Sequence, residues 1–514
     1  MKKNILPLIL ILAILGLSDS LYLAKIHYAN LVPPCVNHLF LIDCGQVLRS
    51  QYSTLSGIPL ALIGVFHYGL LSFIILVAWL TKNKVLRYLI IILTLIGAVA
   101  SLYFMYLQLI MIKSICLYCI LSALISFTLF FFTQWYLKKE RKKLVIVVFE
   151  LKYRHLIKPF FFLFDPETIH NLITSLGERL SQLPLYKNIT QYLLRYDSPV
   201  LKQTLVGIVF DRPTGLSAGF DYEAKLTQTL GSLGFGFTTV GTITNMAYEG
   251  NSQPMLGRLP KSRSLMVNKG FKNDGAKKVV EKLTPYFFDI PIGISIGRTN
   301  SRKLTTQKES VRDIVKAFML FEKSIVKHSY YELNISCPNL FGDISFYPPK
   351  NLKELLNEID KLHLKKPVFV KMPIEKSDEE TTDMLEIIIR YNFIDGVIFG
   401  NLQKDRNDPA FDRKEVKLFS VGNFSGKPTE KRSNELIKLA YRRYGKKLVI
   451  IGCGGIFNTE DAYMKIKLGA SLVQLITGMI YQGPQLVAQI NLELIDLLKK
   501  DGFNNISEAV GIEV

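Results

Sequence analysis

The chain has 514 residues, a formal net charge of +20 and a hydrophobic content of 49%, with a mean hydropathy of +0.23. This apolar fraction, together with the positive mean hydropathy, is high for a soluble protein and indicates a membrane part. The cations are spread along the chain without a nucleic-acid-binding motif, so we expect no nucleic-acid partner. Attraction of a cytoplasmic face to anionic lipid accounts for the same charge.

Four long apolar runs occupy the first quarter of the chain. They span residues 4–25, 58–80, 86–112 and 116–137. Each is long enough to cross a bilayer core of about 30 Å as a helix. A cleaved signal peptide is the alternative for the first run, but no small-residue cleavage site is evident and three more runs follow. We therefore predict an all-α, four-helix transmembrane bundle over residues 1–137.

A basic stretch at residues 138–143 separates this bundle from a part of soluble character. Further cations lie before the first run and between the second and third runs: Lys2, Lys3, Lys82, Lys84 and Arg87. The positive-inside rule places all of these cations in the cytoplasm. We therefore expect a cytoplasmic C-terminal part, an extracytoplasmic loop at 31–56, and a flexible basic linker at 138–152.

Four of the six cysteines belong to the apolar part: Cys35, Cys44, Cys116 and Cys119. The predicted orientation puts all four at the outer surface, where an oxidising compartment favours disulfide chemistry. Cys116 and Cys119 form a Cys-x-x-Cys pair at the start of the fourth helix, where the helix dipole favours a thiolate. Zinc is the usual alternative, but no histidine lies at finger-like spacing, so we predict no metal. Cys35 and Cys44 can relay disulfides to this pair.

These residues resemble the vitamin K epoxide reductase family over about residues 4–135. The resemblance rests on four helices, two loop cysteines, Ser50 six residues after Cys44, the entry Ser56-Gly57-Ile58-Pro59-Leu60 to the second helix, and Cys116-Leu117-Tyr118-Cys119. Bacterial members take electrons from a thioredoxin-like partner and pass them to a quinone. The resemblance thus implies a multi-pass protein of a bacterial inner membrane and a separate extracytoplasmic thioredoxin-like partner.

The same resemblance assigns roles to individual residues. It implies Cys35 and Cys44 as the shuttle pair and Cys116 with Cys119 as the quinone-proximal pair. Ser50 would help to hold the quinone, either ubiquinone or menaquinone.

Residues 153–186 carry two aromatic, apolar helical patterns, at 156–164 and 166–183. An ordinary buried helix face is one interpretation. The basic stretch just upstream favours the other interpretation, an amphipathic helical hairpin that docks on the membrane or its quinone.

Eight short β-rich runs alternate with helical patterns in the rest of the chain. They lie at 215–219, 237–242, 292–297, 331–336, 368–372, 396–401, 448–455 and 472–478. This alternation predicts an α/β fold, a (β/α)8 TIM barrel over residues 187–514. Its active site is expected at the carboxyl ends of the strands.

Polar and glycine residues gather at those ends. They are Asn334, Cys337 and Asn339 after the fourth strand, Lys371 in the fifth, Asn401 after the sixth, Gly454-Gly455 after the seventh and Thr477-Gly478 at the eighth. Backbone N–H groups of the last two segments can cradle a phosphate. A phosphate site together with a buried lysine indicates FMN.

Residues 153–495 resemble the quinone-dependent, membrane-associated dihydroorotate dehydrogenases. The matching stretches include Phe164-Asp165-Pro166-Glu167, Gly215-Leu216-Ser217-Ala218-Gly219-Phe220-Asp221, Val240-Gly241-Thr242-Ile243-Thr244, Asn334-Ile335-Ser336-Cys337-Pro338-Asn339, Phe424-Ser425-Gly426-Lys427-Pro428 and Gly452-Cys453-Gly454-Gly455-Ile456. In that family the helical hairpin forms the quinone tunnel.

Position by position, the resemblance implies an FMN site and a substrate site. FMN would contact Ala218, Gly219, Thr242, Asn334, Lys371, Gly400, Gly426, Gly455, Ile476 and Thr477. Asn334, Asn339 and Asn401 would bind the pyrimidine ring and its carboxylate. Lys371 would place positive charge at the N1/O2 edge of the flavin. Cys337 would be the base that removes the C5 proton while the C6 hydride passes to the flavin.

The sequence departs from the family pattern at several positions. Membrane-associated members normally have serine where this chain has Cys337. The other departures are Tyr222 for a lysine, Val267 and Ser295 for asparagines, and Leu402 for a threonine or serine. Lys269 and Arg298 are candidates to replace the lost lysine charge. Two alternatives stay open: an FMN oxidoreductase with a different dihydropyrimidine-like substrate, and a degenerate barrel acting as a membrane-docked scaffold.

Overall fold

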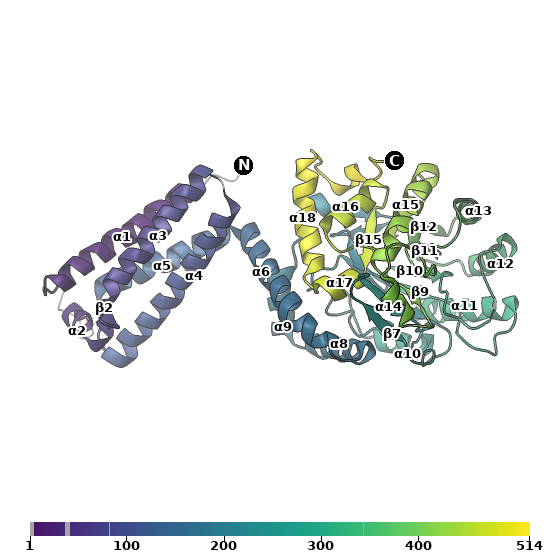
Figure 1. Ribbon diagram of the computed structural model, residues 1–514, viewed down its shortest axis with the longest axis horizontal. Helices are drawn as coiled ribbons and strands as arrows, with labels where there is room; N and C mark the ends of the chain where they lie inside the picture. Colours follow the sequence, from purple (N-terminus) through teal and green to yellow (C-terminus); the bar gives the residue numbers. More distant parts are fainter. Residues whose placement is uncertain (1–4, 36–41, 82, 343) are drawn as a thin grey trace. The chain divides into compact units, whose positions relative to one another are not determined.

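The structure of the protein is a computed structural model that describes residues 5–35, 42–81, 83–342 and 344–514. It comprises two compact units, Met1–Val145 and Ile146–Val514 (Figure 1). Lys2, Lys3 and Lys82, on which part of the predicted orientation rests, lie outside the described residues.

The first unit is a bundle of four long helices. They are α1 (Leu6–Tyr28), α3 (Leu60–Thr81), α4 (Lys84–Tyr106) and α5 (Leu117–Tyr136). All four are long and apolar enough to cross a membrane, with α4 counted together with the turn that follows it. Large apolar side chains point outward, among them Phe66 at 73% and Leu80 at 70% exposure. An apolar exterior suits helices that face lipid, and the prediction of four spanning helices is confirmed.

Small residues let α1 and α3 approach closely. A Cβ atom on Gly16 would lie 2.5 Å from the Tyr68 ring, and one on Gly64 would lie 2.7 Å from the Ser20 hydroxyl. Such contacts are typical of membrane helix pairs, which gain stability from close backbone packing. The Tyr68 hydroxyl bonds to Ser126 Oγ at 2.7 Å, so its polar group is satisfied inside the bundle.

Short elements form the cysteine-bearing end of the bundle. They are α2 (Cys44–Leu48), the 3-10 turn η1 (Gln51–Ser53), the antiparallel strands β1 (Thr54–Leu55) and β2 (Ile58–Pro59), and the π-helix η2 (Leu107–Ile112). The Asp43 N–H donates to the Ile115 carbonyl at 3.1 Å. This bond lays the loop that carries Cys44 across the start of α5.

The basic segment at 138–152 is helical, whereas the sequence predicted a flexible linker. Lys138–Lys152 forms the helix α6, in which the boundary between the two units falls. Lys, Arg, Glu and Leu are strong helix formers, so the charged composition that suggested a linker also favours a helix. Glu140 pairs with Arg87 of α4 at 2.8 Å.

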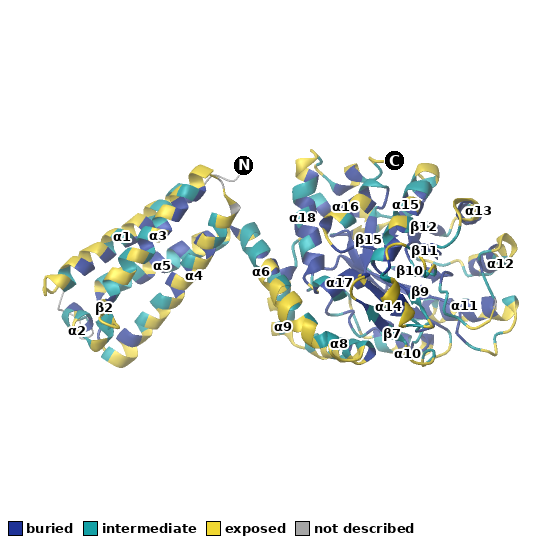
Figure 2. Cartoon of the chain, in the orientation of Figure 1, coloured by how far each residue is buried: buried dark blue, intermediate teal, exposed yellow. Residues whose placement is uncertain are grey.

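Four further helical segments follow α6 in the second unit. The π-turn η3 (Tyr153–Ile157) and α7 (Lys158–Phe162) lead into α8 (Pro166–Leu180), and a helix that was not predicted, α9 (Pro184–Leu194), comes next. Leu163 and Leu185 are 80% and 72% exposed, and Figure 2 shows exposed residues along α8 and α9. The predicted amphipathic hairpin is therefore present, with an apolar surface open on its outer side.

The core of the second unit is a closed barrel of eight parallel strands. In chain order they are β5 (Thr214–Leu216), β6 (Phe237–Ile243), β9 (Ile292–Ile296), β10 (Tyr330–Asn334), β11 (Val368–Met372), β12 (Ile394–Phe399), β14 (Val449–Cys453) and β15 (Leu472–Leu475). Each strand lies beside the next in this order, and β15 pairs with β5 to close the ring. The predicted TIM barrel and all eight of its predicted strands are confirmed.

Aromatic side chains fill one end of the barrel beside glycines on the neighbouring strands. The space that a Cβ on Gly293 would need is taken by the Tyr330 ring, and Phe237 and Phe369 stand beside Gly215 and Gly396 in the same way. Alternating large and small residues close-pack the interior, as is usual in this fold. The hairpin of β3 (Gln203–Leu205) and β4 (Ile208–Phe210) adds Phe210 to this cluster.

The remaining elements surround the barrel. A three-stranded antiparallel sheet contains β7 (Leu256–Leu259), β8 (Ser264–Val267) and β13 (Asn423–Phe424). The helices are α10 (Ala276–Leu283), α11 (Gln307–Glu322), α12 (Pro349–Asp360), α13 (Asp378–Ile388), α14 (Arg413–Lys417), α15 (Glu430–Tyr444), α16 (Thr459–Lys467), α17 (Thr477–Gln482) and α18 (Leu486–Lys500).

Candidate functional sites

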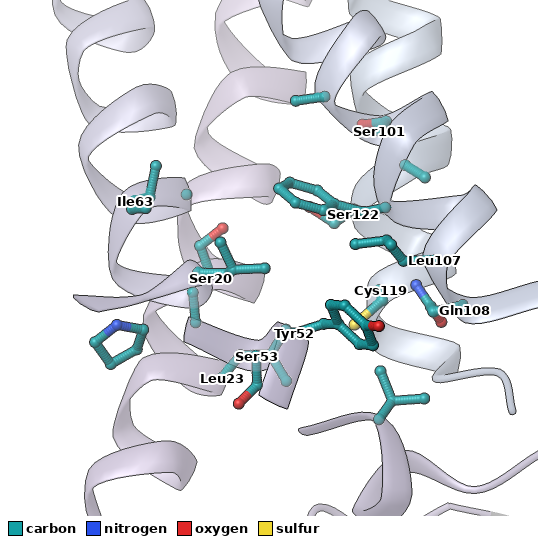
Figure 3. A pocket seen from close by; sticks show the side chains of 18 of the residues that line it. Ser20, Leu23, Tyr52, Ser53, Ile63, Ser101, Leu107, Gln108, Cys119 and Ser122 are labelled. Carbon is teal, nitrogen blue, oxygen red and sulfur yellow. The ribbon is translucent and has the colours of Figure 1, made fainter. Parts of the chain in front are cut away.

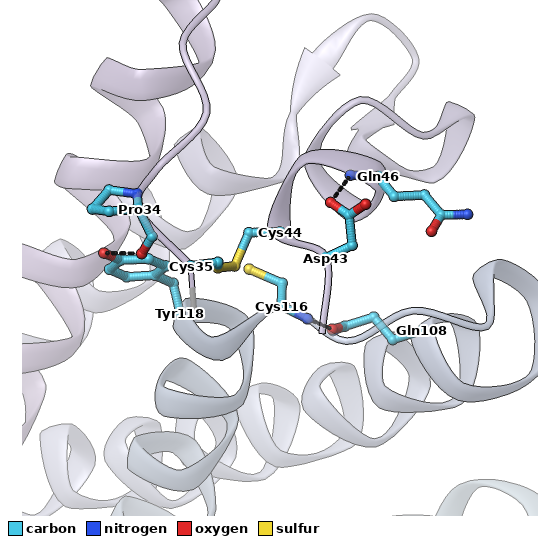
Figure 4. The surroundings of a disulfide bond; sticks show 8 residues. All are labelled: Pro34, Cys35, Asp43, Cys44, Gln46, Gln108, Cys116 and Tyr118. Atoms are coloured by element: carbon cyan, nitrogen blue, oxygen red, sulfur yellow. Dashed lines mark hydrogen bonds between the residues drawn. A yellow bond between two sulfur atoms is a disulfide. The ribbon is translucent and has the colours of Figure 1, made fainter. Parts of the chain in front are cut away.

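The four cysteines of the first unit lie together in one cluster. Cys35 and Cys44 form a disulfide with a Cα–Cα distance of 6.1 Å. Cys116 and Cys119 are free thiols, and Figure 4 shows the Cys116 sulfur facing the disulfide. Cys44 and Cys116 are almost completely buried, at 1% and 0% exposure. The loop pair and the helix pair are thus placed for direct thiol–disulfide exchange, which requires contact between sulfur atoms.

Hydrogen bonds hold Cys116 in this position. Its backbone N–H donates to Gln108 Oε1 at 2.9 Å, and the Ser114 N–H donates to the Gln108 carbonyl at 3.1 Å. A hydrogen bond from the Cys119 thiol lowers the pKa of Cys116 below the usual value for a thiol. Cys116 is therefore the better nucleophile of the pair toward the neighbouring disulfide.

A cavity of about 300 Å³ lies inside the helix bundle next to these thiols. Cys119 lines it and Cys116 does not, so the two thiols of the pair face different partners (Figure 3). Ser50, to which the resemblance assigns a quinone-holding role, also lines the cavity, and its hydroxyl donates to the Val47 carbonyl at 2.8 Å. A mostly apolar cavity with a few polar groups is suited to a ring-shaped, lipid-soluble ligand.

Predicted site residues of the second unit meet at the carboxyl ends of the barrel strands. Asn334 donates from Nδ2 to Thr242 Oγ1 at 2.7 Å and accepts from the Ser336 hydroxyl at 2.9 Å. Asn401 donates from Nδ2 to the Ser336 carbonyl at 2.7 Å. One network therefore joins the ends of β6, β10 and β12 and fixes both amides.

Asn339 belongs to a different part of the site. Its Nδ2 donates to the Val267 carbonyl at 3.0 Å, and its Oδ1 accepts from Asn423 at 2.7 Å. The three-stranded sheet that supplies Val267 and Asn423 was not predicted from the sequence. This sheet anchors Asn339. Because Asn339 follows β10, the sheet lies beside the carboxyl end of that barrel strand.

Cys337 follows β10 in the turn that carries Asn339. Burial raises the pKa of its thiol to about 11, although the Asn339 N–H and the cations Lys404, Lys371 and Arg298 act in the opposite direction. A thiol with a raised pKa is a weak nucleophile but a strong base once it has ionised.

Lys371 lies in β11 among polar groups of the barrel interior. It is 5% exposed, and its Nζ donates to Ser217 Oγ at 3.0 Å and lies 3.6 Å from Glu332 Oε1. Glu332 is completely buried and also accepts from Ser295 Oγ at 2.7 Å. Glu332 was not predicted as a site residue. An acidic residue inside an apolar strand is costly to bury, and that position could have indicated a functional role.

Two of the predicted glycines lie near the segment that follows β15. A Cβ on Gly426 would lie 2.8 Å from Thr477, and one on Gly219 would lie 3.9 Å from Ile476. Gly400 would collide with the Cys453 carbonyl if it carried a side chain. At Gly400 and Gly426 a glycine is needed, because a side chain would press against neighbouring backbone or side chains.

Comparisons with known proteins agree with this architecture. The profile of the dihydroorotate dehydrogenase family matches residues 200–498. A dihydroorotate dehydrogenase (quinone) from Nitratiruptor sp. is 35% identical over 361 residues, which cover 70% of this chain and 98% of the relative. The chain belongs to the dihydroorotate dehydrogenase family. A quinone-dependent member from Christiangramia forsetii is 34% identical, covering 67% of this chain and 99% of the relative.

Solved structures and a second family complete the assignment. The ferulenol complex of the dihydroorotate dehydrogenase from Eimeria tenella superposes with a TM-score of 0.61 at 26% identity, covering 68% of this chain and 96% of that chain. The profile of the vitamin K epoxide reductase family matches residues 7–134. The protein is therefore a vitamin K epoxide reductase-family domain fused to a dihydroorotate dehydrogenase-family domain, and the two bacterial relatives named above are quinone-dependent dihydroorotate dehydrogenases.

In this dihydroorotate dehydrogenase domain, a lysine stands next to the unusual Tyr222. Lys269 Nζ donates to the Tyr222 hydroxyl at 2.8 Å and lies 4.3 Å from the centre of its ring. The cation is 7% exposed, and burial lowers the pKa of Lys269 to about 8. The positive charge that position 222 lacks is thus present beside it, on a side chain that comes from the end of β8.

Helix α8 contacts the same pair of residues. The His170 ring stacks on Tyr222 with centroids 5.3 Å apart, and Glu167 forms ion pairs with Lys269 at 3.4 Å and Lys272 at 3.1 Å. Burial, followed by the nearby lysines, lowers the pKa of His170 to about 3. His170 is therefore neutral at physiological pH. Arg298 instead donates to the Phe341 carbonyl at 2.5 Å, which ties it to the loop after Cys337.

Proposed function

We propose that the barrel oxidises dihydroorotate to orotate in pyrimidine biosynthesis, with FMN as its cofactor and a membrane quinone as the final acceptor. The observation that carries this proposal is the Asn334–Ser336–Asn401 network at the strand ends, next to Cys337. The donors present suit FMN: a buried lysine for the ring edge, fixed amides, and glycine segments for the phosphate. When bound, FMN would accept the hydride from the substrate.

The residues of the chain do the rest of the chemistry in this proposal. Cys337 takes the proton from C5 of the substrate, and the hydride on C6 of the substrate passes to the flavin. One proton and one hydride account for the two hydrogens that the substrate loses. Asn334, Asn339 and Asn401 orient the pyrimidine ring. Lys371 holds positive charge where negative charge develops. The apolar surface of α7, α8 and α9 admits the quinone from the bilayer.

We further propose that the first unit oxidises protein thiols with quinone. Electrons pass from an extracytoplasmic, thioredoxin-like protein to Cys35 and Cys44, then to Cys116 and Cys119, and then to a quinone in the cavity beside Cys119 and Ser50. Each transfer between cysteine pairs is a thiol–disulfide exchange. The support is the cluster of four cysteines, of which only Cys119 lines the cavity. The protein then resides in a bacterial inner membrane with its barrel in the cytoplasm.

A flavin titration tests the proposed barrel activity. The purified full-length protein is expected to retain FMN and to lose its visible flavin absorbance when dihydroorotate is added without quinone. Quinone should restore the absorbance. Bound flavin that dihydroorotate does not bleach would favour a different dihydropyrimidine-like substrate. Purified protein without flavin would favour the scaffold alternative.

Lys269 is expected to replace the missing lysine at position 222 in binding the substrate carboxylate. Lys269→Met should weaken orotate binding, measured by calorimetry, by about tenfold or more, because a charge-assisted hydrogen bond contributes about 1.5–3 kcal/mol. Exchanging the two residues, Tyr222→Lys with Lys269→Tyr, should restore most of the affinity. Lys272→Met is the matched control, since Lys272 shares Glu167 but does not contact Tyr222. Equal losses in both single lysine variants would contradict the assignment.

The two electron paths are expected to be independent in this proposal, because the thiols face the outer side and the flavin the inner side of the membrane. Cys116→Ser should therefore leave the rate of quinone reduction by dihydroorotate unchanged. The measurement is quinone consumption by the full-length protein in lipid, with dihydroorotate as the only reductant. Loss of this activity in Cys116→Ser would show that the two units form one path.

A further inference from the structure

One side chain in the first unit contacts both the inner cysteine pair and the cavity. Gln108 lies in the π-helix η2 and is 4% exposed. Its Oε1 accepts the backbone N–H of Cys116 at 2.9 Å, as Figure 4 shows. The same residue lines the cavity together with Cys119 (Figure 3). Gln108 therefore links Cys116 to the space proposed for the quinone.

The bond from Cys116 fixes which way the Gln108 amide points. A backbone N–H requires an acceptor, so the amide oxygen faces Cys116 and the NH2 group faces away from it. Within the described part of the chain, Gln108 Nε2 makes no hydrogen bond. It is also absent from the set of side-chain atoms that are fully buried and lack a partner, so some of its surface is accessible. The NH2 group is accordingly open to the cavity, where it can donate to a ligand.

Local backbone structure places Gln108 there. In a π-helix the wider turn accommodates one more residue than an α-helical turn, and such turns occur frequently at functional sites. The turn ends at Lys113, whose φ of 57° is left-handed. On the outer side Gln46 bonds to the Ser114 hydroxyl, and its Nε2 lies 3.5 Å from the Ile112 carbonyl. A chain of contacts thus runs from α2, which carries Cys44, to the turn that carries Gln108.

We propose that Gln108 donates from Nε2 to a carbonyl oxygen of the quinone while its Oε1 holds Cys116, so that the quinone ring is kept beside Cys119. This inference rests on the proposed thiol-oxidising function. In the step concerned, the thiols of Cys116 and Cys119 become a disulfide, and the two electrons and two protons that they lose convert the quinone to the quinol. An N–H donor at the carbonyl stabilises the negative charge that builds on that oxygen. Gln108 is thus a quinone-binding residue and a positioning residue for Cys116.

The test measures the two half-reactions of the full-length protein separately. Gln108→Leu is expected to raise the quinone KM about fivefold to tenfold, the effect of losing one hydrogen bond of roughly 1 kcal/mol. The variant should also slow the formation of the Cys116–Cys119 disulfide after a quinone analogue is added. Gln108→Glu should keep the KM within about threefold of wild type, because a buried carboxyl group stays protonated and both accepts and donates hydrogen bonds.

Gln46→Leu is the matched control. It breaks the contacts of α2 with Ser114 but lines no part of the cavity, so it should slow thiol exchange with Cys44 while leaving the quinone KM unchanged. An unchanged quinone KM in Gln108→Leu would overturn the proposal. Equal KM increases in Gln108→Leu and Gln46→Leu would also overturn it, because they would indicate a general distortion of the loop. If quinone does not oxidise the Cys116–Cys119 pair even in the wild type, the thiol-oxidising function itself fails.

Discussion

Replacing Cys337 by alanine is expected to slow the reduction of bound flavin by dihydroorotate about 100-fold or more, the usual scale for loss of a general base. The variant should keep its flavin, because Cys337 is not among the residues proposed to hold FMN. Cys337→Ser should retain part of the activity, since serine is the usual base in membrane-associated members of the family. Stopped-flow measurement of flavin bleaching under anaerobic conditions checks both variants.

The pH dependence gives a second, independent outcome for the same residue. Burial raises the pKa of Cys337 to about 11. The thiolate is the base, so its fraction increases about tenfold per pH unit below that pKa. The wild-type rate of flavin reduction should therefore rise with pH between 7 and 9. A flat profile over that interval, or equal rates in wild type and Cys337→Ala, would remove Cys337 from the reaction.

Periodicity and composition were sufficient to predict the fold because each unit repeats one simple pattern. Apolar runs longer than 20 residues have few structures open to them other than membrane helices. The eight strands have short apolar cores bounded by glycine and polar residues, and their order in the barrel follows the chain. The basic segment at 138–152 was predicted to be flexible, because there the composition pointed to two different structures. Its charges suggested solvation, while the helix propensity of the same residues favoured α6.

Sequence motifs predicted which residues belong to the sites, but they did not predict the contacts between segments that are distant in the chain. Tyr222 and Lys269 are far apart in the chain, and nothing in either local pattern indicated their 2.8 Å hydrogen bond. Asn339 depends likewise on β8 and β13, which pair across more than 150 residues. Gln108 lies within a long apolar run, where a single glutamine is easily taken for a residue of the helix interior.

Replacing Cys119 by serine is expected to abolish quinone-coupled thiol oxidation, because Cys119 is the cysteine that lines the cavity. The variant should also accumulate a mixed disulfide between Cys116 and a loop cysteine. Cys116 faces the Cys35–Cys44 disulfide and can attack it, and the thiol that would resolve the product is missing. Non-reducing peptide mapping should detect this species, and flavin content should equal that of the wild type. Cys337→Ala is the reciprocal control: it removes a thiol from the barrel and should leave thiol oxidation unchanged. Continued thiol oxidation in Cys119→Ser would mean that quinone takes electrons from another cysteine, and the order of transfer from Cys116 to Cys119 to quinone would have to be abandoned.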